Sequence, residues 1–261
     1  MTAIHATAIV DPKAELASDV TVGPYSIVGP DVKLGAGVVL HSHVVVVGRT
    51  SIGARTQIYP FASIGQPPQD LKYHGEPSTL EIGSDNLIRE YVTMNSGTEG
   101  GGMVTRVGSH GTFLASAHVG HDCHIGDHVI LSNTTLLAGH CRVEDFVIFG
   151  GGSAVHQFVR IGRHAFVGGA SAVESDIIPF GLVVGNRASL MGLNLVGLKR
   201  RGFTREQINA MRDAYGQIFA AEGTLRDRVA AVAERFSGNP DVMEIVNFIQ
   251  AAADRPLCTP R

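Results

Sequence analysis

The chain has 261 residues and a formal net charge of −3, with 17 % charged residues, 32 glycines and no tryptophan. This length allows one large domain or two small ones, and a slightly acidic balance argues against a general nucleic-acid binder. The start, MTAIHATAIVDP, lacks the basic end and apolar run of a signal peptide, and no apolar stretch approaches the ~20 residues of a membrane span. We therefore expect a cytoplasmic protein with no stable membrane insertion and no nucleic-acid partner.

From Ile4 onward, every sixth residue is apolar. The series covers 4–64, 82–94 and 107–173, and the residue that follows the apolar position is often glycine. Neither the 3.6-residue period of a helix nor the alternation of a simple strand explains a strict period of six. A parallel β-helix with three short flat faces does, because each hexapeptide then supplies one face and its apolar residue points inward. Eighteen residues complete one coil.

The two interruptions of the period, 66–81 and 95–106, are predicted to be loops that project from the prism. The repeat fades after Pro179, and we expect a β-helix domain over 1–186 and a helical domain over 187–261. Within the second region, TREQ at 204–207 predicts a capping box that opens a helix to about residue 221. Thr224 predicts the start of another to about residue 236, and a third follows Asn239. The predicted fold class is mainly β, with C-terminal helices.

The stretch AHVGHDCHIGDH, residues 117–128, has the histidine density of a metal site. The period separates its members, since His118 and His124 are six apart and fall on successive faces of one coil. Two such side chains do not easily reach one ion from within one chain. We expect no metal here.

His121 has a different setting, because residues eighteen apart stack on neighbouring coils. It is followed by Asp122, Gly139 lies one coil above it, and His140 stacks over Asp122. This arrangement combines a base, a carboxylate that orients it and a backbone N–H for a developing oxyanion. It favours acyl transfer without a metal.

Four segments together identify a family. FASIGQPPQDLKYHGEP (61–77), AHVGHDC (117–123), LAGHCRVEDFVIFGGGSAVHQFVRIG (137–162) and GLKRRGF (197–203) resemble the UDP-N-acetylglucosamine O-acyltransferases, which are hexapeptide-repeat acyltransferases. The resemblance runs from Ile4 to the final helices, in the same order and with the same two insertions. It implies a left-handed β-helix and a homotrimer with active sites in clefts between neighbouring subunits.

The resemblance also implies an activity. Members of this family transfer an (R)-3-hydroxyacyl group from acyl carrier protein to the 3-hydroxyl of UDP-N-acetylglucosamine, the first step of lipid A synthesis. No cofactor is expected, because the donor arrives on the phosphopantetheine of the carrier protein. By resemblance, His121 is the general base, Asp122 orients it and Gly139 supplies the oxyanion-hole N–H.

Substrate contacts are implied at further positions, each with a role taken from the family. These are the active-site histidines His118 and His156, the sugar and nucleotide contacts His140 and Gln157, the loop pair Asp70 and Lys72, the basic pair Arg200 and Arg201 for the phosphopantetheine and nucleotide phosphates, and Gly169. A glycine at 169 leaves the acyl groove open, so we expect a longer acyl chain than a bulky residue would allow.

Asn95, Ser96, Arg187 and Val196 depart from residues that are frequent in the family. Because they are expected around the substrate cleft, acylation of a 3-amino UDP-sugar stays open. A zinc carbonic anhydrase, trimeric and of the same fold, is the alternative from another reaction class. Two of its zinc-binding histidines lie five apart on one chain, and no two of the twelve histidines here do. A third hypothesis is that the protein is a non-catalytic scaffold.

Overall fold

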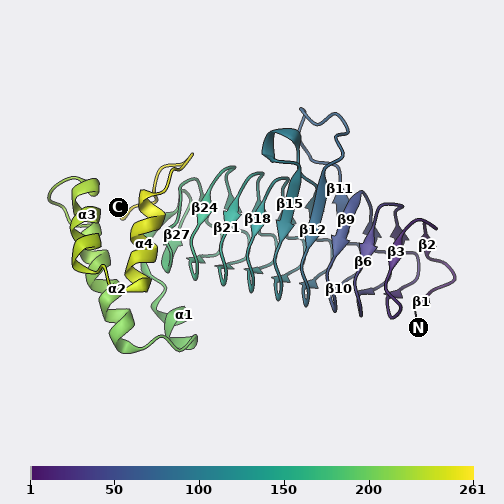
Figure 1. The fold of residues 1–261 in the computed structure, drawn as a ribbon, viewed down its shortest axis with the longest axis horizontal. Helices are drawn as coiled ribbons and strands as arrows, with labels where there is room; N and C mark the ends of the chain where they lie inside the picture. The colour runs from purple at the N-terminus through teal and green to yellow at the C-terminus, as the bar shows by residue number, and fades with distance from the viewer. Residues whose placement is uncertain (1) are drawn as a thin grey trace.

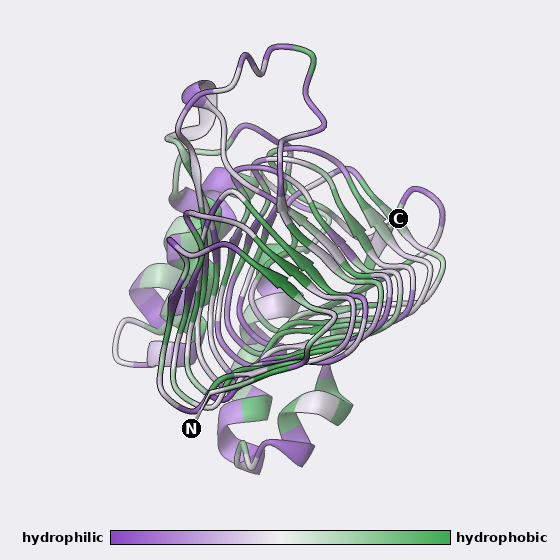
Figure 2. Ribbon diagram, turned by 90° about the vertical axis from the view of Figure 1, so that its right-hand side faces the viewer, coloured by the Kyte–Doolittle hydropathy of each residue, from purple (hydrophilic) through white to green (hydrophobic). Residues whose placement is uncertain are grey.

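The computed structural model describes residues 2–261. The chain forms an elongated prism of short strands that begins near the N-terminus and carries a cluster of helices at its far end (Figure 1). Figure 2 looks along this prism and shows its three-sided section, from which loops project on one side. Successive strands fall in turn on three sheets, here called A, B and C, so the chain is a parallel β-helix.

Each coil adds one strand to each sheet. Sheet A contains β1 (Ala3–Ile4), β4 (Thr21–Val22), β7 (Val39–Leu40), β10 (Gln57–Ile58), β13 (Leu87–Ile88), β16 (Thr112–Phe113), β19 (Ile130–Leu131), β22 (Ile148–Phe149), β25 (Phe166–Val167), β27 (Gly181–Val184) and β28 (Ser189–Leu193). Sheet B contains β2 (Ile9–Val10), β5 (Ile27–Val28), β8 (Val45–Val46), β11 (Ser63–Gln66), β14 (Thr93–Asn95), β17 (His118–Val119), β20 (Leu136–Leu137), β23 (Ala154–Val155) and β26 (Ala172–Val173). Sheet C contains β3 (Glu15–Leu16), β6 (Lys33–Leu34), β9 (Arg49–Ile52), β12 (Thr79–Ile82), β15 (Val104–Val107), β18 (His124–Ile125), β21 (Arg142–Val143) and β24 (Arg160–Ile161).

The six-residue period corresponds to the last, inward-facing residue of nearly every strand. Val22 pairs with Leu40 and Leu40 with Ile58, so residues eighteen apart stack in register. These side chains are almost fully buried and form one continuous core along the prism. The predicted coil of eighteen residues is confirmed.

The corners of the prism require a left-handed backbone conformation, and most of the residues that adopt it are not glycine. Tyr25, His43, Phe61 and Tyr91 all have φ near +60° where the chain passes from sheet A to sheet B. This conformation disfavours side chains with a Cβ, but the rings of neighbouring coils stack on one another. Many of the histidines therefore serve as stacked corner residues.

Both insertions occur at the corner between sheets B and C, on consecutive coils. The first connects β11 to β12 and the second connects β14 to β15, with a short 3-10 turn, η1 (Glu99–Gly101). The long strands β12 and β15 pair over four residues, which leaves 67–78 and 96–103 outside the strands. The two loops therefore project from neighbouring coils at one corner, called corner BC below (Figure 1).

Four helices follow the prism: α1 (Leu195–Arg200), α2 (Arg205–Ile218), α3 (Leu225–Arg235) and α4 (Pro240–Gln250). The predicted capping box of α2 is present, and Thr224 and Asn239 cap α3 and α4 through their side chains. The sequence analysis missed α1 and the antiparallel pairing of β28 with β27, so the predicted boundary at 186 falls within a hairpin. Among residues 2–261 no helix has the length and apolar character needed to cross a membrane.

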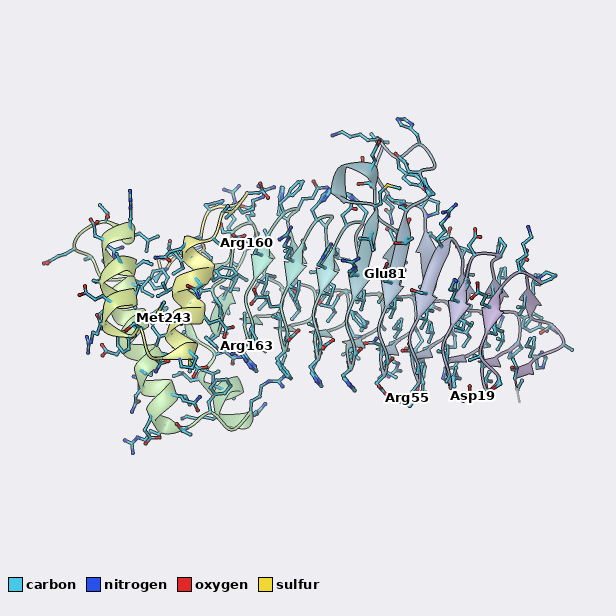
Figure 3. All side chains as sticks on the ribbon, in the orientation of Figure 1. Asp19, Arg55, Glu81, Arg160, Arg163 and Met243 are labelled. Atoms are coloured by element: carbon cyan, nitrogen blue, oxygen red, sulfur yellow. The ribbon has the colours of Figure 1, made fainter. Side chains whose placement is uncertain are left out.

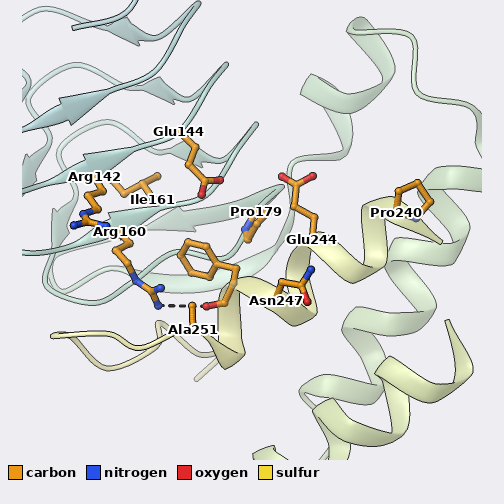
Figure 4. Close-up of a pocket in the computed structure, with 10 residues that line it drawn as sticks. Arg142, Glu144, Arg160, Ile161, Pro179, Pro240, Glu244, Asn247 and Ala251 are labelled. Carbon is orange, nitrogen blue, oxygen red and sulfur yellow. Dashed lines mark hydrogen bonds between the residues drawn. The ribbon is translucent and has the colours of Figure 1, made fainter. Parts of the chain in front are cut away.

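Arginines at the end of sheet C attach the helices to the prism (Figure 3). Arg163 forms a salt bridge with Glu244 of α4, at 2.6 Å between Nη2 and Oε2. Arg160 pairs with the buried carboxylate of Asp176 and donates to the carbonyl of Phe248, which Figure 4 shows as a dashed line. A cavity of about 500 Å³ lies between α4 and sheet C, and none of the predicted site residues lines it.

Candidate active site

Corner BC gathers the residues that carry the predicted chemistry. His121 and Asp122 follow β17, and the backbone N–H of His140 on the next coil donates to the carbonyl of His121 at 2.9 Å. The imidazoles of His121 and His140 meet edge to face, with ring centroids 4.9 Å apart. His140 also stacks on Phe158 of the following coil. The predicted stacking of this corner is present.

His121 and Asp122 form a buried pair. Nδ1 of His121 lies 2.8 Å from Oδ2 of Asp122, and their side chains are only 8 % and 1 % exposed. Asp122 accepts two further hydrogen bonds, from the backbone N–H of Thr98 at 2.8 Å and from its hydroxyl at 2.6 Å. Its own N–H donates to the hydroxyl of Thr105 at 2.7 Å. The carboxylate is thus held from several directions.

These contacts define the protonation of the pair. Burial alone would raise the pKa of Asp122, but the hydrogen bonds from His121 and Thr98 outweigh it, and the pKa lies below its usual value. An ionised carboxylate only accepts hydrogen bonds, so Nδ1 of His121 carries the proton. The Nε2 atom of the neutral ring therefore presents a lone pair, as a general base requires.

Gly139 lies directly against the ring of His121. A Cβ at this position would overlap Cε1 and Nε2 of the imidazole. No acceptor among the described residues receives the N–H of Gly139. The same position on other coils, two residues after the buried residue of a strand, is occupied by Pro24, Pro30 and Pro60. Because proline has no N–H, the fold needs no hydrogen-bond donor at this position, and the N–H of Gly139 is left free.

His118 points outward from sheet B into a groove beside this corner. Its Nδ1 lies 2.7 Å from the hydroxyl of Thr93 on the previous coil. Burial, and then the neighbouring His121, lower the pKa of His118. The groove has a volume of about 590 Å³ and is also lined by His121, Gly139 and Gln157. It provides space for a substrate next to the candidate base.

His140 and the pair His156 and Gln157 extend the site to later coils. Nδ1 of His140 lies 3.8 Å from Oδ2 of Asp122, and burial lowers the pKa of His140. His156 and Gln157 follow β23 on the next coil of the same corner. The structure therefore brings five predicted histidine, glutamine and aspartate side chains to one corner.

Of the remaining predicted residues, two lie in the loop that projects from corner BC, and three lie outside that corner. Asp70 and Lys72 belong to the first loop, and their neighbour Gln69 lines the groove. Gly169 is exposed at the corner between sheets A and B. Arg200 ends α1, and the guanidinium of Arg201 lies over Phe146 at the corner between sheets C and A, 4.4 Å from the ring centroid. One chain does not bring Gly169 and the arginine pair to His121.

Two of the four residues that depart from the family pattern, Asn95 and Ser96, join the two loops. The amide nitrogen of Asn95 donates to the carbonyls of Gln66 and Pro67, at 3.2 and 3.0 Å. The hydroxyls of Ser96 and Ser78 lie 3.1 Å apart. Both residues are buried and hold the loop bases together, whereas Arg187 and Val196 are exposed.

A metal was not expected at this corner, yet the structure places three possible metal ligands together. One ligand atom each of His121, Asp122 and His140 lie within 4.8 Å of one another. In the arrangement observed, Nδ1 of His121 faces Asp122, and Oδ2 of Asp122 accepts from His121 and Thr98. A cation here would have to replace those hydrogen bonds, so the donor set fits proton transfer better than metal binding.

Sequence reasoning missed the residues that hold Asp122. Thr98 and Thr105 flank the glycine-rich part of the second loop, and a Cβ at Gly101 would overlap the carboxylate of Asp122. The signal was the break in the six-residue period, which marks the loop without showing where it folds. Arg255 was also missed, although it contacts both His156 and Gln157.

Comparison with known proteins shows the family of the chain. Family models match at 176–258, described as UDP N-acetylglucosamine O-acyltransferase domain 2, and at 13–48, described as bacterial transferase hexapeptide. The acyl-[acyl-carrier-protein]–UDP-N-acetylglucosamine O-acyltransferase of Caulobacter vibrioides is 57 % identical over 98 % of both chains, and that of Azorhizobium caulinodans is 55 % identical over 97 % of this chain and 96 % of its own.

Solved structures give the same result. LpxA from Acinetobacter baumannii superposes with a TM-score of 0.94 at 41 % identity, covering 98 % of this chain and 99 % of its own. The UDP-N-acetylglucosamine acyltransferase of Francisella novicida superposes with a TM-score of 0.95 at 32 % identity, covering 98 % and 94 %. The expected left-handed β-helix is confirmed by these matches. The chain belongs to the UDP-N-acetylglucosamine O-acyltransferase family.

Proposed function

We propose that this protein transfers an (R)-3-hydroxyacyl group from acyl carrier protein to the 3-hydroxyl of UDP-N-acetylglucosamine, the first step of lipid A synthesis. The observation that carries the proposal is the buried His121–Asp122 pair, packed against a glycine whose N–H has no acceptor within the described chain. High identity to relatives named for this reaction supports the same substrates.

The reaction follows from the protonation of the pair. Nε2 of His121 removes the proton of the sugar hydroxyl, and the oxygen attacks the thioester carbonyl. The N–H of Gly139 stabilises the negative charge on the carbonyl oxygen. The tetrahedral intermediate then collapses: the C–S bond breaks, the ester C–O bond remains, and the proton held by His121 passes to the departing thiolate. Asp122 stays ionised and stabilises the imidazolium.

This scheme needs no metal or organic cofactor. The activating group of the donor is the thioester itself, carried on the phosphopantetheine of acyl carrier protein. The alternative carbonic anhydrase activity would need the cluster of His121, Asp122 and His140 to reorganise around a zinc ion. Metal analysis of the purified active protein tests this point, and stoichiometric zinc with loss of activity on chelation would contradict it.

We further propose a homotrimer with the site between neighbouring subunits. The outward residues of sheets A and B are mostly apolar, as at Ile27, Val39 and Leu136, whereas sheet C presents charged residues such as Arg106 and Arg142. Apolar outer faces favour association between copies of the chain. A second copy would also supply Gly169 and the basic pair to a groove that one chain leaves incomplete.

The substrate test is direct. The protein is incubated with acyl carrier proteins bearing several (R)-3-hydroxyacyl lengths and with UDP-N-acetylglucosamine or its 3-amino analogue, and products are identified by mass spectrometry. We expect a 3-O-acyl product that is cleaved by mild base, as an ester is. An exclusive amide product would shift the assignment to the amino sugar, and no acylated UDP-sugar from any combination would refute the proposal.

A further inference from the structure

The last ten residues of the chain return from the helices to the prism. Two backbone hydrogen bonds fix them to Asp176. The N–H of Asp176 donates to the carbonyl of Pro256, and the N–H of Cys258 donates to the carbonyl of Asp176, both at 2.8 Å. Leu190 also donates to the carbonyl of Thr259 at 3.1 Å. The tail is therefore held against the final coils as an additional edge, close to corner BC.

One side chain of this tail reaches two predicted site residues. Nε of Arg255 donates to the backbone carbonyl of Gln157 at 2.8 Å, and its Nη2 lies 2.5 Å from Nδ1 of His156. A guanidinium is always charged and only donates hydrogen bonds. Nδ1 of His156 must therefore accept this shorter bond, so it donates none to the carbonyl of Gln157 at 3.3 Å, and a neutral His156 carries its proton on Nε2.

We propose that Arg255 is a positioning residue of the active site, which holds His156 as the Nε2–H tautomer and fixes the backbone at Gln157. His156 then presents an uncharged N–H donor to an oxygen atom of a bound substrate. This inference rests on the proposed function, because the site roles of His156 and Gln157 come from family resemblance. Arg255 itself is distant in sequence from every other residue assigned to the site.

The geometry selects arginine at this position. Its planar group offers two N–H donors on one edge, and these meet two acceptors on consecutive residues. A lysine keeps the charge but cannot hold both acceptors in this arrangement. The charge of the adjacent Asp254 acts on His140: burial lowers the pKa of that imidazole, and the charges of Asp122, Asp70 and Asp254 oppose the effect.

The test combines a tautomer measurement with kinetics on the full-length protein. Arg255→Ala and Arg255→Lys are compared with Arg261→Ala, a control from the same tail whose Nη2 donates to the carbonyl of Arg187 and to no other group in residues 2–261. Two-bond ¹⁵N–¹H spectra of histidine-labelled protein report the tautomer, and the His156 signals are assigned by their loss in His156→Gln. Wild type and Arg261→Ala should show a bare Nδ1 and a protonated Nε2.

In Arg255→Ala and Arg255→Lys we expect mixed tautomers at His156 and a fall of about tenfold in kcat/KM, the size of one charge-assisted hydrogen bond. The KM that rises, for UDP-N-acetylglucosamine or for acyl carrier protein, identifies the substrate that His156 contacts. The thermal midpoint should match that of Arg261→Ala.

An unchanged tautomer in Arg255→Ala, or rates within twofold of wild type, would overturn the inference. Equal losses of activity and thermal midpoint in Arg255→Ala and Arg261→Ala would also overturn it, since they indicate that the tail only stabilises the fold. If the wild type forms no acylated sugar, the proposed function fails, and the tautomer spectra still test the geometry without turnover.

Discussion

Replacing Asp122 with asparagine should abolish the base function of His121 while leaving the fold intact. The amide retains an oxygen that can accept from the N–H of Thr98, and the Thr98 hydroxyl can accept a hydrogen bond where it now donates one. The amide nitrogen, however, would face Nδ1 of His121 as a donor. The imidazole would then carry its proton on Nε2, where the lone pair is needed.

The expected loss follows from this reversal. General base catalysis contributes about 10²- to 10⁴-fold to rate, and a ring held in the wrong tautomer forfeits most of it. The charge that stabilises the imidazolium is lost in the same substitution. We therefore expect kcat of Asp122→Asn to fall by about 10³-fold, with little change in KM because neither substrate need contact the carboxylate.

The assay is the initial rate of acyl transfer, with Asp127→Asn as the matched control. Oδ1 of Asp127 also accepts a backbone N–H, that of Ser109 at 2.6 Å, but Asp127 is exposed and lies at another corner. The control should retain wild-type rates. A kcat for Asp122→Asn within threefold of wild type would refute the assignment of Asp122 as the group that orients His121.

Four further outcomes are expected. Gly139→Ala should lower kcat at least ~100-fold, because the new Cβ overlaps the His121 ring; rates near wild type would show that the ring can shift without loss. Gly169→Met should change the preferred acyl length to a shorter chain in a competition between carrier proteins, and an unchanged preference would reject its role in length selection. The lowered pKa of Asp122 stabilises the fold above the unfolded-state pKa, and this contribution is lost as pH falls through the lower folded-state value; acid unfolding curves of Asp122→Asn should therefore show less loss of stability than wild type as pH falls below the unfolded-state pKa of about 3.9, and parallel curves would contradict this. Thr204→Ala removes the capping box of α2 and should cost about 1 kcal/mol in unfolding free energy measured with urea, whereas no change would show that tertiary contacts alone hold this helix end.

The prism could be predicted in detail because its constraint is local and repeated. Each coil places an apolar residue inward every six positions, and the resulting register stacks His140 over Asp122 and Gly139 over His121. The N-termini of three helices, at Thr204, Thr224 and Asn239, could be predicted equally well, since capping depends on residues within one turn. These features need no knowledge of distant contacts.

The contacts that complete the site could not be predicted, because they cross long stretches of chain. Thr98 reaches Asp122 from a loop with no period, and Arg255 reaches His156 across 99 residues. The short helix α1 was missed as well, since its six residues carry no amphipathic period. Loops and tails return to the prism through tertiary packing, which a repeat pattern does not encode.

The single-turnover rate of His121→Ala tests the proposed base most directly. The variant is mixed in excess with (R)-3-hydroxyacyl carrier protein and UDP-N-acetylglucosamine, and the acylated product is followed by mass spectrometry. We predict a fall of at least ~10²-fold in rate, with the Kd for UDP-N-acetylglucosamine from calorimetry within threefold of wild type. A single-turnover rate within tenfold of wild type would contradict the role of His121 as the general base.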